Sequence, residues 1–296
     1  MKNKIKFYYN LDGMIIEGNN SYYLFLCDDI YYFYLKCERE INEVQDIIKI
    51  CNEIKMKNIQ VGEIIPNIKK EYISEGYILI KLNCFLDEEI DIKQMNRYNN
   101  IFQLSNKYVN NWNILWKEKI DYLEYQIREL GKNKKTVISS FSYYIGLAEN
   151  ALFNLDKINK LYTNDGVMVL SRLRVTYPAF EKDYFNPMNF IFDSRMRDIS
   201  EYLKSKFFAG IDIWDDIDYI FRDKYTSYEY NIFYARMLYP SYYFDVYEEV
   251  ILNGISESKL QVITSKTEDY EDFLRKLYIY LSKYTVILEI PWILKK

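Results

Sequence analysis

The chain has 296 residues, of which 49% are hydrophobic, and a net charge of −4 from 39 basic and 43 acidic residues. This length can bury a sizeable core and lies near the size at which one core divides into two. Charges of both signs are spread along the whole chain, so there is no basic footprint for nucleic acid or for an anionic membrane surface. We therefore predict neither nucleic acid nor a membrane as a partner.

The chain contains no histidine, whereas 32 of its residues are tyrosine. Histidine is the side chain that most readily exchanges protons near neutral pH, and it is the commonest metal ligand. Its absence disfavours most hydrolytic chemistry and leaves carboxylates, Lys, Tyr, Ser or Cys for any catalysis. A binding or structural role gains weight for the same reason.

The amino terminus shows no apolar segment followed by a cleavage site, and no run of about 18 apolar residues occurs in the chain. The four cysteines, Cys27, Cys37, Cys51 and Cys84, have no CxxC spacing. This pattern indicates reduced, mostly buried thiols and neither a disulfide frame nor a zinc site. We predict a cytosolic protein.

The first 83 residues have the pattern of strands around one helix. Residues 22–27 and 30–37 are aromatic and β-branched runs joined by Asp28-Asp29, which predicts a hairpin. Apolar residues at helical spacing over 41–51 predict the helix. Two further strands are predicted at 70–73 and 77–82, around a turn at Glu75-Gly76.

From about residue 85 onward the apolar periodicity is helical. Stripes at helical spacing predict helices over residues 112–130, 141–152, 199–207, 213–220 and 273–284. The sequence contains no repeat and no low-complexity linker, so we expect a short hinge around residues 82–87. The predicted division is a β-rich lobe over 1–84 and a helical lobe over 85–296.

This order of elements resembles the kinase-like fold of aminoglycoside and choline phosphotransferases. A sharper likeness is local: it lies in NPMNFIFD at 186–193, RDISEYLK at 197–204 followed by two phenylalanines at 207–208, and YARMLYPSYYF at 234–244. These segments resemble the CotS/YutH-like, spore-coat-associated proteins of endospore-forming bacteria. The resemblance implies an α+β, two-lobed, protein-kinase-like fold with a small β-rich N-lobe and a larger helical C-lobe.

In kinases a lysine of the third strand holds the nucleotide phosphates and pairs with a glutamate of the following helix. The resemblance places Lys36 and Glu43 at these two positions. The alternative is an edge-strand lysine and a helix-start glutamate that are both simply solvated. Residues 17–21, EGNNS, are the candidate loop over the phosphates if ATP binds.

The catalytic loop of such phosphotransferases reads His-Gly-Asp, with an Asn five residues after the Asp. The Asp deprotonates the acceptor hydroxyl and the Asn holds magnesium. At the matching place the chain has Leu170-Ser171-Arg172-Leu173-Arg174, and Ala179 stands five residues after Arg174. The resemblance therefore implies that the base and the metal-binding amide are both lost, and no catalytic residue is assigned.

One carboxylate remains as a candidate metal ligand. Asp183 precedes Asp198 by fifteen residues, which is close to the distance between the magnesium aspartate and a later structural aspartate in the phosphotransferases. The alternative is a loop aspartate that only favours a turn. Asp198 is expected to cap or anchor its own helix.

The leading functional prediction is a catalytically degenerate, kinase-like scaffold or assembly factor of the spore coat, made in the mother-cell cytoplasm. Its expected partners are other coat proteins, and it needs no cofactor. The alternative is an ATP- and magnesium-dependent phosphotransferase for a small molecule, using Lys36, Glu43 and Asp183. A generic cytosolic protein-interaction module is the third hypothesis.

Overall fold

The computed structural model describes residues 1–19, 22–83, 86–101, 103–104, 112–131, 134–162 and 166–295. It divides into two compact units, one made of residues 1–91 with 178–191 and the other of residues 92–177 with 192–296. Asn20 and Ser21 of the candidate phosphate loop, Cys84, and part of the expected hinge lie outside the described residues. No described helix has the length and apolar character needed to cross a membrane.

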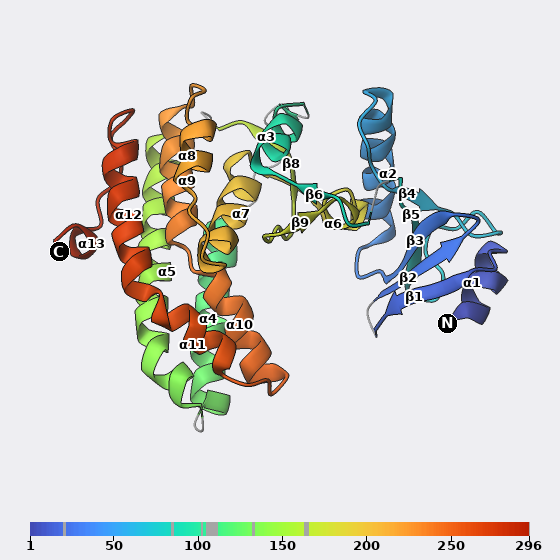
Figure 1. Ribbon diagram of the computed structural model, residues 1–296, viewed down its shortest axis with the longest axis horizontal. Coiled ribbons are helices and arrows are strands. Elements are labelled where there is room, and N and C mark those ends of the chain that lie inside the picture. Colours follow the sequence, from blue (N-terminus) through green and yellow to red (C-terminus); the bar gives the residue numbers. More distant parts are fainter. Residues whose placement is uncertain are drawn as a thin grey trace. The chain divides into compact units, whose positions relative to one another are not determined.

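The first unit is built on a five-stranded antiparallel sheet (Figure 1). Its strands stand in the order β1-β2-β3-β5-β4 and comprise β1 (Met14–Gly18), β2 (Tyr22–Cys27), β3 (Ile30–Lys36), β4 (Glu63–Ile65) and β5 (Tyr77–Lys81). The predicted β2–β3 hairpin is confirmed. Asp28 and Asp29 at its turn have φ values of 49° and 59°, the left-handed conformation that two-residue hairpin turns require.

Helices and short elements complete the first unit. The predicted helix is confirmed as α2 (Ile41–Met56), whose buried residues are Val44, Ile47, Cys51 and Ile54. The amino terminus forms α1 (Lys2–Tyr9), which packs Ile5 and Tyr9 against the sheet core. The remaining elements are β6 (Glu89–Ile90), β9 (Ala179–Phe180), α6 (Glu181–Tyr184) and the 3₁₀ turn η2 (Pro187–Asn189).

The predicted strand at 70–73 is wrong. The side chain of Asn67 accepts hydrogen bonds from the backbone N–H groups of Lys69 and Glu71, which closes a turn in place of a strand. The strand beside β5 is instead β4. The turn at Glu75-Gly76 is confirmed, because both residues have positive φ and Ser74 pairs with Tyr77 across it.

The second unit is mainly helical. Its elements are α3 (Ile92–Ile101), β7 (Gln103–Leu104), α4 (Trp112–Leu130), α5 (Lys135–Leu161), β8 (Met168–Arg172), α7 (Met196–Phe208), α8 (Trp214–Ile220), α9 (Ser227–Leu238), α10 (Ser241–Leu252), α11 (Ser258–Ser265), α12 (Thr267–Leu281) and α13 (Pro291–Leu294). β10 (Phe190–Ser194) enters from the first unit and pairs with β8 in a three-stranded sheet that ends with β7. The long helix α5 packs against α4 and α9 (Figure 1). The predicted helical stripes correspond to α4, α5, α7, α8 and α12.

Tyrosines form much of the interior of the second unit. Tyr144 of α5 stacks on Tyr243 of α10 with ring centroids 3.8 Å apart, and both rings are buried. Tyr234, Tyr247 and Tyr270 are buried as well. Such rings bury a large area each and gain further from their stacked and edge-on contacts. The tyrosine excess of the sequence therefore builds a core, while Tyr122, Tyr125 and Tyr284 are among those exposed.

This tyrosine core predicts a sharp loss of stability at alkaline pH. Burial raises the pKa of Tyr144 and of Tyr225 to about 12, whereas an unfolded tyrosine titrates near pH 10. Because the folded pKa values are the higher ones, the stability is fully present below about pH 10 and is lost as the pH rises toward 12.

Urea-denaturation midpoints measured from neutral pH upward should stay level and then fall above about pH 10. The exposed tyrosines should ionise near pH 10, and the ultraviolet absorbance from the tyrosinate of the buried rings should appear later, together with unfolding. Gradual ionisation of the buried rings near pH 10, without loss of the fold, would contradict this expectation.

Candidate functional site

The candidate phosphate-binding lysine lies at the end of β3. Lys36 Nζ is 3.3 Å from Glu38 Oε1, and the two side chains are 57% and 79% exposed. Glu43 lies in the first turn of α2, where the helix dipole favours a carboxylate, and it is exposed. In the described part of the chain Lys36 therefore pairs with Glu38, and the ion pair with Glu43 that the resemblance implies is not formed.

The candidate metal ligand Asp183 belongs to the short helix α6 of the first unit. Its side chain is exposed, but the neighbouring protein removes part of its hydration and raises the pKa of its carboxyl. Lys182 lowers this pKa, and the Glu17 carboxylate of β1 raises it further. Asp183 thus lies within electrostatic range of a second carboxylate, which disfavours its ionised form.

The segment at the catalytic-loop position continues from β8. Arg172 and Asp198 are 4% and 0% exposed. The carboxylate of Asp198, on α7, accepts hydrogen bonds from the Arg172 backbone N–H at 2.9 Å and from Arg172 Nη1 at 3.4 Å. Asp198 therefore anchors the end of β8 to α7. It does not cap its helix, whose N-cap residue is Arg195.

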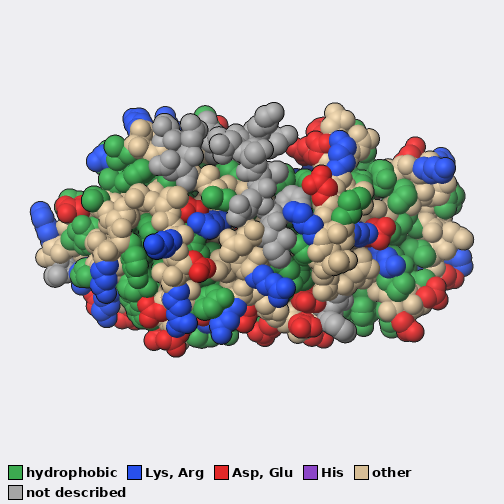
Figure 2. Space-filling model, turned by 90° about the horizontal axis from the view of Figure 1, so that it is seen from above, with side chains coloured by type: hydrophobic (Ala, Val, Ile, Leu, Met, Phe, Trp, Pro, Cys, Tyr) green, Lys and Arg blue, Asp and Glu red, His purple; other side chains and the backbone are tan. Residues whose placement is uncertain are grey.

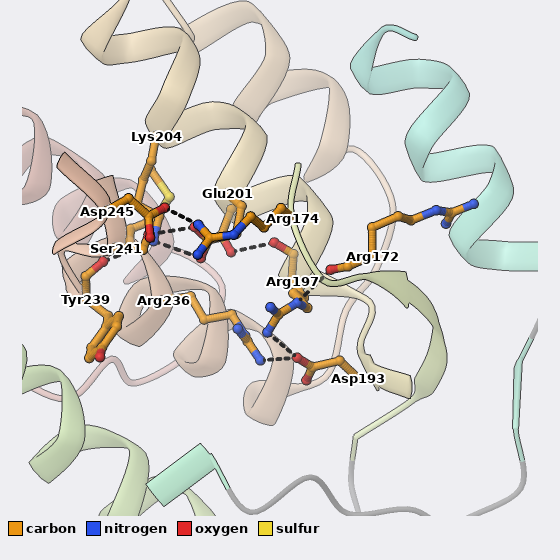
Figure 3. A network of polar contacts seen from close by, with 12 residues as sticks. Arg172, Arg174, Asp193, Arg197, Glu201, Lys204, Arg236, Tyr239, Ser241 and Asp245 are labelled. Atoms are coloured by element: carbon orange, nitrogen blue, oxygen red, sulfur yellow. Dashed lines mark hydrogen bonds and ion pairs between the residues drawn. The ribbon is translucent and has the colours of Figure 1, made fainter. Parts of the chain in front are cut away.

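Arg174 and Ala179, the other two residues at the catalytic-loop position, also have contacts of their own. Arg174 is exposed and forms an ion pair with Asp245 of α10 (Figure 3). Ala179 lies in β9, pairs with Ile90 of β6 and is buried. A guanidinium and a methyl group thus stand where the resemblance expects a carboxylate base and a metal-binding amide.

A second buried carboxylate, Asp193, lies at the end of β10 and is shared by two arginines (Figure 3). Its Oδ2 accepts from Arg197 Nη1 at 3.0 Å and from Arg236 Nη2 at 2.6 Å, while Oδ1 accepts from the Ser194 N–H. Arg197 also donates to the carbonyl oxygens of Arg172 and Leu173. Both guanidinium groups lie near the ring of Trp112, at 4.3 and 5.2 Å from its centroid.

A buried lysine completes the network. Lys204 of α7 is 1% exposed and donates to Glu201, to the carbonyl of Tyr239 and to the hydroxyl of Ser241. Burial lowers the pKa of Lys204 against the opposing effect of Glu201. Burial alone would raise the pKa of Glu201, but the Lys204 ammonium lowers it. The pair fastens the start of α10 to α7.

This arrangement does not fit a magnesium–nucleotide group at residues 170–179. The carboxylates of Asp193 and Asp198 are turned to arginines and backbone N–H groups, so their oxygens are already used. A magnesium ion requires free oxygen ligands in octahedral geometry. Within the described ranges no three Cys, Asp or Glu side chains come together as metal ligands.

Arg197, Arg236, Glu201 and Lys204 also belong to the site, although they are not among the residues predicted from the sequence. A signal was nevertheless present for each. Arg236 stands alone among apolar residues in IFYARML at 232–238, and a buried arginine must be paired. Asp193 and Arg197, like Glu201 and Lys204, are opposite charges at helical spacing in a stretch that also carries core residues.

The class of protein follows from the fold: the chain has the two-lobed, α+β, kinase-like architecture. A spectinomycin phosphotransferase in complex with ADP and spectinomycin superposes with a TM-score of 0.54 at 13% identity, over 89% of this chain and 91% of that one. The AMP-bound complex of a spectinomycin phosphotransferase gives a TM-score of 0.54 at 12% identity, over 90% and 93%. At these identities the likeness concerns the fold alone.

The family is shown by the sequence. The model described as "Spore coat putative kinase YutH" matches residues 2–277, and the chain belongs to this family. The endospore coat-associated protein YutH of Bacillus subtilis (strain 168) is 26% identical over 204 residues, which cover 62% of this chain. The match spans 60% of the length of that relative. The family resemblance expected from segments 186–193, 197–204 and 234–244 is thereby confirmed.

Proposed function

We propose that this protein is a catalytically degenerate kinase-like component of the spore coat, which acts as a scaffold or assembly factor. One observation carries the degeneracy: at the catalytic-loop position Arg172 is buried against Asp198, and Arg174 is paired with Asp245. General-base catalysis needs a group that can accept a proton near neutral pH. A guanidinium cannot do so, because it stays protonated.

The coat assignment rests on the family and on the printed name of the Bacillus subtilis relative. We extend that association to this chain, with other coat proteins as partners and the mother-cell cytoplasm as the place of synthesis. The described surface suits such contacts. On the face drawn in Figure 2, acidic and basic side chains are interspersed among apolar ones, without a patch of a single sign.

A phosphotransferase remains the second candidate because of one observation. Asp183 and Lys36 are both exposed and belong to the same unit. If ATP and magnesium bind, Lys36 and Asp183 are the residues that would hold the phosphates and the metal, and Glu43 of α2 is the partner that the resemblance assigns to Lys36. The general base would then have to be a residue outside 170–179.

Variants of these residues separate the two proposals in spores. We expect the Lys36→Ala/Asp183→Ala double variant to assemble into the coat as the unchanged chain does, because a scaffold uses neither residue. Removing two exposed side chains should alter the free energy of unfolding by no more than about 0.5 kcal/mol each. The measurement is the amount of chain in purified coats, with spore resistance as a second readout.

The matched control is Asp46→Ala/Lys49→Ala, which removes an exposed ion pair from α2 of the same unit. Normal accumulation of the Lys36/Asp183 variant together with a coat defect, absent in the control, would favour the phosphotransferase. Equal coats from the two double variants would favour the scaffold.

A further inference from the structure

The second unit contains a cavity of about 400 Å³ beside the buried charge network. It is bounded by α4, by the segment after β8, and by α7, α9 and α10. Lys119, Arg174, Arg197 and Arg236 contribute cationic side chains to its lining, whereas Glu201 and Asp245 contribute carboxylates. Its volume lies within the range of small-molecule sites, which is about 300–1,000 Å³.

The ion pairs around the cavity leave one positive charge over. Lys119 pairs with Glu248, Arg174 with Asp245, and Lys204 with Glu201. Arg197 and Arg236 then share the single carboxylate of Asp193. A buried charge is stable only when it is paired and hydrogen-bonded, so an excess cation favours an anion in the cavity.

Arg236 carries this excess. The residue is 4% exposed, and in the described part of the chain its one hydrogen bond runs from Nη2 to Asp193. Arg197 by contrast uses Nε, Nη1 and Nη2 for three acceptors. A guanidinium has five N–H donors, so Nε and Nη1 of Arg236 can still donate to an oxygen that enters the cavity. Figure 3 shows Arg197 and Arg236 converging on Asp193 from different helices.

The remaining walls are aromatic and aliphatic. Trp116 stacks on Tyr239 with ring centroids 4.1 Å apart, and Trp112 lies beside them in the lining. Leu115 and Leu173, which also line the cavity, are 46% and 49% exposed and so mark its opening to solvent. These walls match an apolar ligand body, since apolar surface gains free energy when it leaves water.

We propose that this cavity binds a small organic monoanion: a carboxylate on an aromatic or branched apolar body. The carboxylate accepts hydrogen bonds from Arg236, and the body packs against Trp112, Trp116 and the two leucines. This proposal does not depend on whether the protein binds nucleotide, because Lys36 and Asp183 are not part of the cavity. It would make the scaffold responsive to a metabolite of this class.

The test uses the full chain and two probes of the same shape, 3-phenylpropionate and its uncharged amide. Titration followed by intrinsic tryptophan fluorescence and by calorimetry should show saturable binding of the acid, at least tenfold tighter than binding of the amide. A charge-assisted hydrogen bond from a buried arginine accounts for a difference of this size.

Variants locate the binding. Arg236→Gln should lower the affinity for 3-phenylpropionate at least tenfold, while its amide still donates one hydrogen bond to Asp193. Arg128→Gln, on the exposed end of α4, should leave this affinity unchanged. Leu115→Glu should lower the affinity for the acid at least tenfold, because its carboxylate repels the ligand's carboxylate at the opening. Leu115→Gln should change this affinity less than threefold. If Arg236→Gln does not fold, the comparison of Leu115→Glu with Leu115→Gln tests the binding site. No saturable binding of the acid, equal affinity for the amide, or indifference to Leu115→Glu would overturn the proposal.

Discussion

Replacing Asp193 by alanine is expected to lower the free energy of unfolding by about 3–5 kcal/mol. Asp193 is 2% exposed and is the shared acceptor of Arg197 and Arg236. Without its carboxylate, two guanidinium groups stay buried with no counter-charge, and the Ser194 N–H loses its acceptor. Urea denaturation followed by far-ultraviolet circular dichroism and tryptophan fluorescence measures the change.

Two controls show whether the charge or the shape is responsible. Asp193→Asn keeps an oxygen acceptor and the volume, so it should destabilise less than Asp193→Ala. Asp46→Ala removes an exposed carboxylate from α2 and should stay within about 0.5 kcal/mol of the unchanged chain. If Asp193→Ala were as stable as the unchanged chain, the pairing of Asp193 with Arg197 and Arg236 would not stabilise the fold, which contradicts this account of the network.

Removing the carboxylate of Asp198 is the second change with a large expected effect, again about 3–5 kcal/mol for Asp198→Ala. The residue is fully buried, and its partner Arg172 is 4% exposed. The variant removes the acceptor of the Arg172 backbone N–H and the counter-charge of the Arg172 guanidinium, which keeps its hydrogen bond from Nη1 to the Leu170 carbonyl oxygen. Because this bond joins β8 to α7, the loss should appear as a lower urea midpoint for the second unit.

A double-mutant cycle isolates the pair. Asp198→Asn keeps an acceptor for the Arg172 N–H, and Arg172→Leu removes the buried cation. The loss in the free energy of unfolding of the double variant should be smaller than the sum of the losses of the two single variants, by about 0.5–3 kcal/mol. Strict additivity would mean that Arg172 and Asp198 do not stabilise each other and would contradict the anchoring role.

Much of the fold could be predicted where the signal is local. The β2–β3 hairpin follows from two apolar runs around Asp28-Asp29, and α2, α4 and α5 follow from one-sided apolar stripes. Helix α9 escaped prediction for a physical reason. All of its residues from Glu229 to Leu238 are buried, so it has no polar face to reveal a period.

The site could be predicted only in part, because its pairs join distant segments. Asp193 meets Arg236 over 43 positions, and Asp198 meets Arg172 over 26. Spacing cannot show such contacts. The position of Asp198 near the start of α7 suits a helix cap equally well, and only its burial against the Arg172 N–H shows the anchoring. The departures predicted at Arg172, Arg174 and Ala179 rest on the resemblance to the phosphotransferase pattern.

These contacts stabilise the kinase-like architecture around residues 170–179. Arg172, Arg197 and Arg236 neutralise the buried carboxylates of Asp193 and Asp198, and their hydrogen bonds connect β8, β10, α7 and α9. Such a network specifies the local structure and leaves no proton acceptor at residues 170–179.

The central claim, the proposal that this kinase-like chain carries out no nucleotide chemistry, is tested most directly by titrating the full chain with ATP and magnesium. Thermal unfolding follows binding, because any ligand of the folded state raises its stability in proportion to the logarithm of its concentration. We expect an unchanged unfolding temperature at millimolar ATP and magnesium, and no release of ADP. A stabilisation that grows with ATP and magnesium, and that Asp183→Ala abolishes, would contradict the account.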